Sequence, residues 1–443
     1  MENETNLEQY LVQCQRDLTK AESADDPRAL SLAQANFGYA LCLKKKYEQG
    51  MDYFNQAEKT AGLEVDDLDV IAHGLGLRIL AYQQSKRLPD AFQTANKILL
   101  MAEQEDHPGV ECDALTSQGQ VLLASGELEE SFRRLQEAEN IAENIQDEQR
   151  LLKIKGELAA LSLAIPSLEK AEAYYRQAVE LAETLEDTEA EMGYLGNVGA
   201  VMAWQGKDRQ AVEIFQEVLS YERSEGNPGR VIPLLKKLVE SYDKLQEDQQ
   251  VLTYGIQGLE FLEDQSSELI YDFLEPIILA YYRQGKIQEA HNMTSEAVTI
   301  ARSTNDPERE AEFLMSLGES FLAADMLERA LDTYQSALQV ARKLDRDYYQ
   351  AQLMGRIALV NAELGNLEEA RDQHQQAIEM AQEYRLRELE GDQRSLLAMT
   401  YHELDDMEKA REQAERALDI FQKIERDGKI AKAQQLVDNY NKE

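Results

Sequence analysis

Residues 311–345, AEFLMSLGESFLAADMLERALDTYQSALQVARKLD, carry the pattern that decides the fold of this chain. Gly318 is followed by Phe321 after three residues and by Ala330 after twelve, and Tyr334 lies four residues further on. Apolar residues three and four apart share one face of a helix. Small residues at these spacings let two helices approach closely, while large residues fill the space between pairs. The stretch therefore predicts two packed helices joined by a short turn.

The position of Ala330 recurs throughout the chain. Equivalent residues follow one another at intervals of 39 to 41, and nine of the ten are Gly, Ala or Ser. The ten positions are Gly50, Ala91, Ser131, Ala171, Ala211, Val251, Ala290, Ala330, Ala370 and Ala410. Positions seven residues later and twelve residues earlier repeat with the same period. The sequence therefore predicts ten helix–turn–helix units.

This unit resembles the tetratricopeptide repeat, whose signature includes L-G-x2-Y followed by A-x3-F. Its period of 40 exceeds the usual 34, and residues 27–424 look like the long-repeat class found in bacterial regulators, kinesin light chains and spindle-orientation adaptors. The resemblance implies an all-α fold: a right-handed α-solenoid, or superhelix, of about ten repeats with terminal capping helices. Such folds bind proteins or peptides in a concave groove.

The ends of the array carry further amphipathic patterns. Asp26 suits a helix cap and Pro27 the first helical position, so a separate helix is expected before them. Terminal units of a repeat array need a solvated outer face. We divide the chain into an N-terminal capping helix (1–26), repeats one to five (27–227), repeats six to ten (228–424) and a C-terminal capping helix (425–443).

The sixth and seventh repeats depart most from the pattern. Gly255 and Gly258 stand where a large residue and an alanine are usual, and Pro233 and Pro276 fall inside predicted first helices. A proline inside a helix removes one backbone hydrogen bond and clashes with the preceding turn. We expect a kink or a packing irregularity within residues 228–290.

Composition limits the possible partners and compartments. The net charge of −38, from 84 acidic and 46 basic residues, repels phosphate backbones and anionic membranes. No apolar run approaches 18 residues, and the N-terminal sequence lacks the pattern of a secretory signal. Cys14, Cys42 and Cys112 are odd in number and widely spaced, which is typical of a reducing compartment. We expect a cytoplasmic protein that binds neither nucleic acid nor membrane.

No motif in the sequence indicates catalysis, a metal or a cofactor. The five histidines are scattered, and neither HExxH nor paired CxxC motifs occur. Gly193, Gly196 and Gly199 lie every third residue inside a predicted helix, which is a packing pattern and not a phosphate loop. Acidic residues are so frequent that no pair stands out as an acid–base couple. We expect no enzyme, no cofactor and no metal site.

The resemblance also implies which positions face a ligand. They lie six, three and two residues before the position of Gly318 in each first helix, and one, four and five residues after it. In repeats five to seven and nine these positions bring cationic, amide and aromatic side chains to the inner surface. The candidate partner-binding residues are Asn197, Trp204, Lys236, Lys237, Lys244, Tyr282, Arg283 and Arg356.

Two interpretations of these residues stay open. In the first, the cations and Trp204 bind carboxylates and apolar groups of a partner. In the second, the lysines pair with acidic residues of this chain, such as Glu240, Asp243 and Glu275, and Trp204 belongs to the core.

The leading hypothesis is a scaffold that binds a protein or peptide segment in a groove centred on repeats five to seven. The alternative is a regulatory sensor that closes around a small signalling peptide or other small ligand. Self-association is a third possibility.

Overall fold

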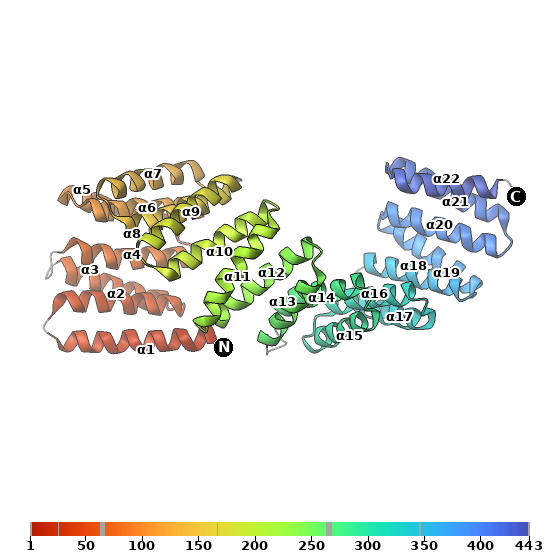
Figure 1. Ribbon diagram of the computed structural model, residues 1–443, viewed down its shortest axis with the longest axis horizontal. Coiled ribbons are helices and arrows are strands. Elements are labelled where there is room, and N and C mark those ends of the chain that lie inside the picture. Colours follow the sequence, from red (N-terminus) through yellow and green to blue (C-terminus); the bar gives the residue numbers. More distant parts are fainter. Residues whose placement is uncertain are drawn as a thin grey trace. The chain divides into compact units, whose positions relative to one another are not determined.

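A computed structural model describes residues 2–24, 26–62, 67–165, 167–262, 268–344 and 347–441, with the side chains of residues 2–6 excepted. These residues form 22 α-helices and no strand, so the prediction of an all-helical repeat solenoid is confirmed (Figure 1). The helices are α1 (Glu2–Ser23), α2 (Pro27–Leu43), α3 (Tyr47–Thr60), α4 (Leu68–Gln84), α5 (Leu88–Glu105), α6 (Pro108–Ser125), α7 (Leu128–Asn144), α8 (Glu148–Ala164), α9 (Leu168–Thr184), α10 (Thr188–Trp204), α11 (Asp208–Ser224), α12 (Pro228–Lys244), α13 (Asp248–Phe261), α14 (Tyr271–Arg283), α15 (Ile287–Ser303), α16 (Pro307–Ala323), α17 (Leu327–Lys343), α18 (Asp347–Glu363), α19 (Leu367–Glu383), α20 (Arg387–Glu403), α21 (Met407–Lys423) and α22 (Asp427–Tyr440).

The chain forms two compact units, Met1–Gly226 and Asn227–Glu443. The first contains α1 and the pairs α2/α3 to α10/α11; the second contains the pairs α12/α13 to α20/α21 and then α22. Within each pair, we call the even-numbered helix the first helix and the odd-numbered helix the second.

The recurring small positions are the points of closest helix packing. Ala91, Ser131 and Ala330 are fully buried, and so are the other equivalents from Ala171 to Ala410. Within the eighth repeat, a Cβ atom added to Gly318 would lie 2.6 Å from the ring of Tyr334. The absence of a side chain on one helix thus makes room for an aromatic ring from the other.

The short turns between the two helices of a pair share one backbone conformation. In nine of the ten pairs, within the described residues, one residue between the helices has positive φ: Lys45, Lys86, Gly126, Gly206, Gln246, Gly285, Asp325, Gly365 and Asp405. A left-handed residue lets the following N–H groups bond the last carbonyls of the helix; Met326 N donates to the Phe321 carbonyl at 2.9 Å. The predicted cap is confirmed, because the Asp26 side chain accepts from the N–H groups of Arg28 and Ala29, and Pro27 is the first helical residue.

Repeats six and seven contain shortened helices. α13 has 14 residues and α14 has 13, whereas α12 and α15 have 17 each. Pro233 lies inside α12 and Pro276 inside α14. A Cβ atom on Gly258 would lie 2.3 Å from the ring of Phe273, so a large side chain of the next repeat occupies the place of the usual alanine.

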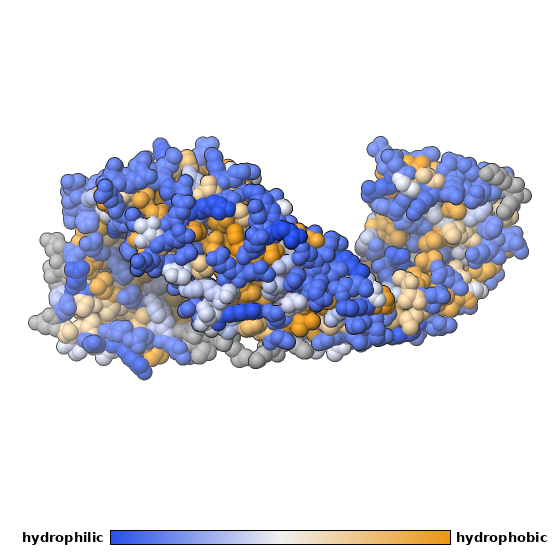
Figure 2. All heavy atoms as spheres, in the orientation of Figure 1, coloured by the Kyte–Doolittle hydropathy of each residue, from blue (hydrophilic) through white to orange (hydrophobic). Residues whose placement is uncertain are grey.

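The two terminal helices cover apolar faces of their units. Cys14 and Leu18 of α1 are buried against Phe37 and its neighbours. Val437 and Tyr440 of α22 are buried in a cluster with α20 and α21. The face in Figure 2 is mostly hydrophilic, with hydrophobic residues scattered between charged ones. No helix in the described part of the chain is long and apolar enough to cross a membrane.

Candidate functional site

The candidates of the fifth repeat lie on α10, in the first unit. Trp204 ends this helix with 62% of its surface exposed, and Asn197 is exposed as well. The interpretation of Trp204 as a core residue is therefore wrong. An indole in this position is available to a ligand, although the partner-binding role of both residues stays a prediction.

The cations of repeats six and seven lie in the second unit and are engaged by acidic neighbours. Lys236 Nζ lies 2.8 Å from Asp272 Oδ2, a contact that raises its pKa. Arg283 bridges Asp243 and Asp248, with 2.6 Å between the charged atoms of each pair. Lys236 and Arg283 therefore pair with acidic residues of this chain, as in the second interpretation above. Their contacts stabilise the junctions between helices and leave them poorly suited to anchor a partner.

Lys237, Lys244 and Tyr282 have different surroundings. Lys237 is half-buried, and burial lowers its pKa, while Lys244 is exposed. Tyr282 packs edge-on against His291, with 6.3 Å between ring centroids. Both lysines lie on α12, whereas Tyr282 lies on α14.

Tyr282 lines a shallow pocket of about 350 Å³ next to Ser320. His291 Nε2 lies 2.6 Å from Ser320 Oγ, a distance that nucleophile–base pairs also show. Ser320 is inside α16, however, where backbone N–H groups are used by the helix and cannot form an oxyanion hole. We interpret the contact as a hydrogen bond that joins α15 to α16.

The inner surface carries a regular ladder of polar contacts between first helices. Its rungs join residues 37 apart, three fewer than the repeat period: Asp113 with Arg150, Gln120 with Glu157, Glu312 with Tyr349, Glu319 with Arg356 and Asp392 with Lys429. Lys236 and Asp272 are 36 apart, because the interval between repeats six and seven is 39. The charged groups in these contacts therefore already have partners.

A groove with a volume of about 650 Å³ lies in the second unit. We call it the C-terminal groove. It is lined by residues of α16, α18, α20 and α22, and by Phe421 of α21. Its apolar lining is Met315, Leu359, Leu389, Leu396, Met399, Phe421 and Leu436, and its polar lining is Glu319, Gln352, Arg356, Asp392, Gln393, Ser395, Lys429, Lys432, Gln435 and Asn439. Its volume lies within the range of ligand pockets, and its lining mixes apolar side chains with a larger number of polar ones.

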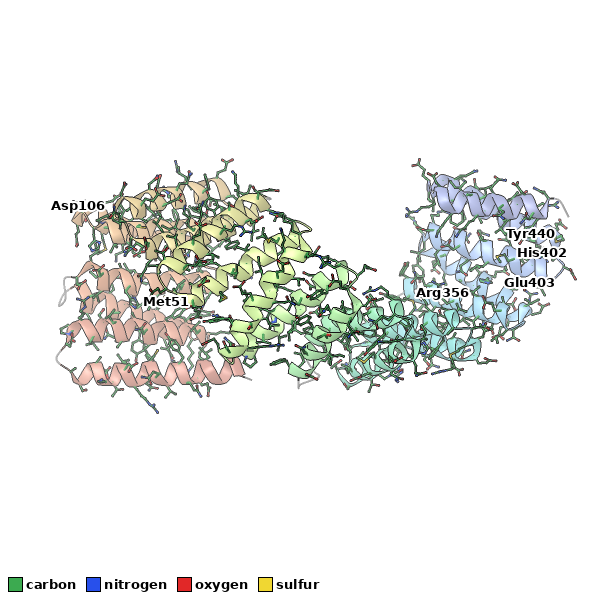
Figure 3. All side chains as sticks on the ribbon, viewed as in Figure 1. Met51, Asp106, Arg356, His402, Glu403 and Tyr440 are labelled. Atoms are coloured by element: carbon green, nitrogen blue, oxygen red, sulfur yellow. The ribbon has the colours of Figure 1, made fainter. Side chains whose placement is uncertain are left out.

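Arg356 is the one candidate from the sequence that lines this groove. Its guanidinium lies 2.8 Å from Glu319 Oε1, and both side chains are nearly half exposed. Figure 3 shows Arg356 on α18, well separated from His402 and Tyr440, where α20 lies beside α22. The rings of His402 and Tyr440 stack at 5.2 Å and fix α22 against α20.

Helix α22 has the inner-face register of an eleventh first helix. Lys432, Gln435, Leu436 and Asn439 lie 40 residues after Asp392, Ser395, Leu396 and Met399, and all eight line the groove. The capping helix is thus also a wall of the candidate site. Extending the 40-residue register past residue 424 would have identified this wall from the sequence.

Lys432 differs from the other cations of the groove. The ladder would pair it with the residue 37 positions earlier, and that residue is Ser395. Lys432 is exposed and makes no ion pair with any described residue, whereas Lys429 contacts both Asp392 and Glu388. Three cations and two carboxylates line the groove, a net charge of +1 in a chain of net charge −38.

Gln393 connects the groove to a buried histidine. Its amide fills the space beside Gly355, and its Oε1 lies 2.8 Å from Nδ1 of His374. His374 is fully buried with no partner for Nε2 in the described residues, and burial lowers its pKa to about 4. The neutral imidazole therefore holds Gln393, which is one of the side chains that line the groove. No group of three or more potential metal ligands occurs in the described part of the chain.

Comparisons with known proteins agree with this architecture. A family model described as the tetratricopeptide repeat matches residues 309–383 and 349–423. The regulatory protein RapG of Bacillus subtilis (strain 168) is 25% identical over 181 residues, which are 40% of this chain and 48% of RapG. The chain thus spans about half the length of that relative.

Two solved structures share the fold. The apo form of RapI superposes with a TM-score of 0.55 at 16% identity, covering 80% of this chain and 98% of RapI. A signal transduction ATPase with a tetratricopeptide repeat sensor, from Pyrococcus horikoshii, gives a TM-score of 0.51 at 20% identity. The match covers 84% of this chain and 55% of that ATPase. At these identities the likeness concerns the fold.

Proposed function

We propose that this chain, whose residues 309–383 and 349–423 match the tetratricopeptide repeat model, is a non-enzymatic scaffold that binds a protein or peptide segment in its C-terminal groove. The observation that carries the proposal is a groove of about 650 Å³ that α16, α18, α20 and α22 line together. Asn197 and Trp204 are proposed as contacts for a partner of the first unit.

The surroundings of the groove favour a protein segment over other ligands. Its lining provides side-chain amides, which can bond a peptide backbone, beside leucine and methionine side chains. The high negative charge of the chain disfavours nucleic acid and anionic membranes. Three free, buried cysteines fit a reducing cytoplasm, where we place the protein.

Two methionine variants test the proposal. Met399 lines the groove and is 46% exposed, while Met326 is 39% exposed and lies outside the lining. Partners captured from the host by the wild-type protein should be lost with Met399→Arg and kept with Met326→Arg. Quantitative mass spectrometry of the three captures decides the matter. Equal capture by both variants would rule out the C-terminal groove as the binding site.

A regulatory sensor is the alternative function. It is favoured by the division into two compact units at Gly226 and Asn227, and by the shortened helices that follow. A sensor requires an element with two arrangements that the ligand binds unequally. Small-angle scattering with and without a groove-binding peptide should then show a change in the radius of gyration. Identical curves at saturation would count against this function.

A further inference from the structure

The charge pattern of the C-terminal groove indicates what kind of segment it accepts. We propose that the groove selects a peptide segment that combines apolar side chains with a carboxylate, and that Lys432 is the anchor for that carboxylate. This inference rests on the proposed function and gives its ligand a chemical class.

The first argument concerns charge. In a chain with 84 acidic residues, the charged lining of this groove consists of Arg356, Lys429 and Lys432 against Glu319 and Asp392. Arg356 and Lys429 already contact carboxylates of the chain. Lys432 has no ladder acid opposite it, because Ser395 takes that position. An incoming carboxylate therefore meets an ammonium group that needs no displacement of an internal partner.

The second argument concerns the neighbours of Lys432. Gln435 and Asn439 follow on the same face of α22, and both line the groove. Their amide N–H groups can donate to the same carboxylate or to the adjacent peptide backbone. Leu396, Met399 and Leu436 form the apolar surface next to these donors. A segment with one acidic group and one or two apolar side chains can therefore contact the donors on α22 and the apolar surface beside them.

The carboxylate has two possible sources, an Asp or Glu side chain or the C-terminus of a peptide. We would select random dodecapeptides displayed with free C-termini against the immobilised full chain. A second selection against the Met399→Arg chain identifies the groove-dependent binders. Synthetic copies of the groove-dependent peptides would then be measured by fluorescence anisotropy in three forms: native, with each Asp or Glu changed to Asn or Gln, and amidated at the C-terminus. The form that loses affinity identifies the source.

Two charge variants of the chain test the anchor. Lys432→Glu should weaken the native peptides about tenfold or more, as expected for loss of a charge-assisted hydrogen bond followed by repulsion. Lys170→Glu makes the same charge change on α9 in the first unit, where Lys170 is exposed, and should leave affinity unchanged. A peptide with Lys in place of its acid should regain affinity for the Lys432→Glu chain.

Each outcome decides between the claims. Groove-dependent peptides without an essential carboxylate, or insensitive to Lys432→Glu, would overturn the inference and leave the proposed function standing. A selection in which no peptide depends on Met399, together with unchanged capture of host partners by Met399→Arg, would overturn both.

Discussion

Tyr334 occupies the space that the absent side chain of Gly318 leaves open. Gly318→Ala would put a Cβ atom 2.6 Å from this fully buried ring. Overpacking of this kind costs about 1–3 kcal/mol, which outweighs the gain of up to about 1 kcal/mol in helix propensity. We expect a lower urea midpoint for unfolding. Gly428→Ala is the control, because its Cβ would meet nothing within 4 Å, and it should be neutral or slightly stabilising.

The buried His374 makes stability depend on pH. Its folded-state pKa of about 4 lies below the ordinary value of 6.5, so the unfolded chain takes up this proton first as the pH falls. Stability is therefore lost between about pH 6.5 and pH 4, by roughly 2–3 kcal/mol at pH 4.5. His374→Gln keeps a polar side chain opposite Gln393 and removes the titration.

Urea unfolding at pH 7 and pH 4.5 measures this effect. The wild-type protein should lose more stability between the two pH values than His374→Gln, since the carboxylates titrate in both. Equal losses would show that His374 is not buried in its neutral form.

At the scale of the helix, Pro233 is the sixth residue of α12 and lies inside it. It is exposed, so packing does not require its ring. Pro233→Ala restores the backbone donor, which favours the helix, but it also gives the unfolded chain more conformational entropy. The net effect should be a stabilisation of the second unit by about 1–3 kcal/mol. The measurement is the thermal midpoint by circular dichroism.

Pro228→Ala in the same helix is the matched control. Pro228 is the first residue of α12, where its missing N–H has no helical acceptor. This variant should show no gain. A gain of the same size from both variants would mean that the benefit comes from somewhere other than the helix interior.

The helices could be predicted from the sequence because small residues such as Ala330 and Ala370 recur every 40 residues. These positions are fully buried, so close packing requires small side chains there. The candidate site could be predicted only in part. Around Arg356, the groove-lining residues Gln352, Gly355 and Leu359 occupy positions that the resemblance implies face a ligand. The acidic partners of Lys236 and Arg283 lie on other helices. The periodicity within one helix cannot predict them, because they depend on how neighbouring helices are offset along their axes. The role of α22 is harder to predict, because Asp438 stands where the 40-residue register places the small residue of a first helix.

For the whole molecule, the net charge of −38 predicts how salt acts. Sodium chloride screens the repulsion among excess carboxylates and also weakens the ladder pairs. Exposed pairs contribute only about 0–1 kcal/mol each, so relief of repulsion should dominate. We expect the thermal midpoint to rise between about 20 mM and about 300 mM salt. A falling midpoint would mean that the ladder stabilises the array more than the excess charge destabilises it.

The central claim is that a partner segment lies against the first helices of the C-terminal repeats, and methyl NMR tests it most directly. The chain would be labelled with ¹³C at its methionine methyl groups and titrated with a groove-dependent peptide. Met315 and Met399 line the groove, whereas Met326 and Met51 do not. We expect shifts or broadening of the Met315 and Met399 signals with little change at Met326 and Met51. Saturable binding that leaves Met315 and Met399 unchanged would contradict it.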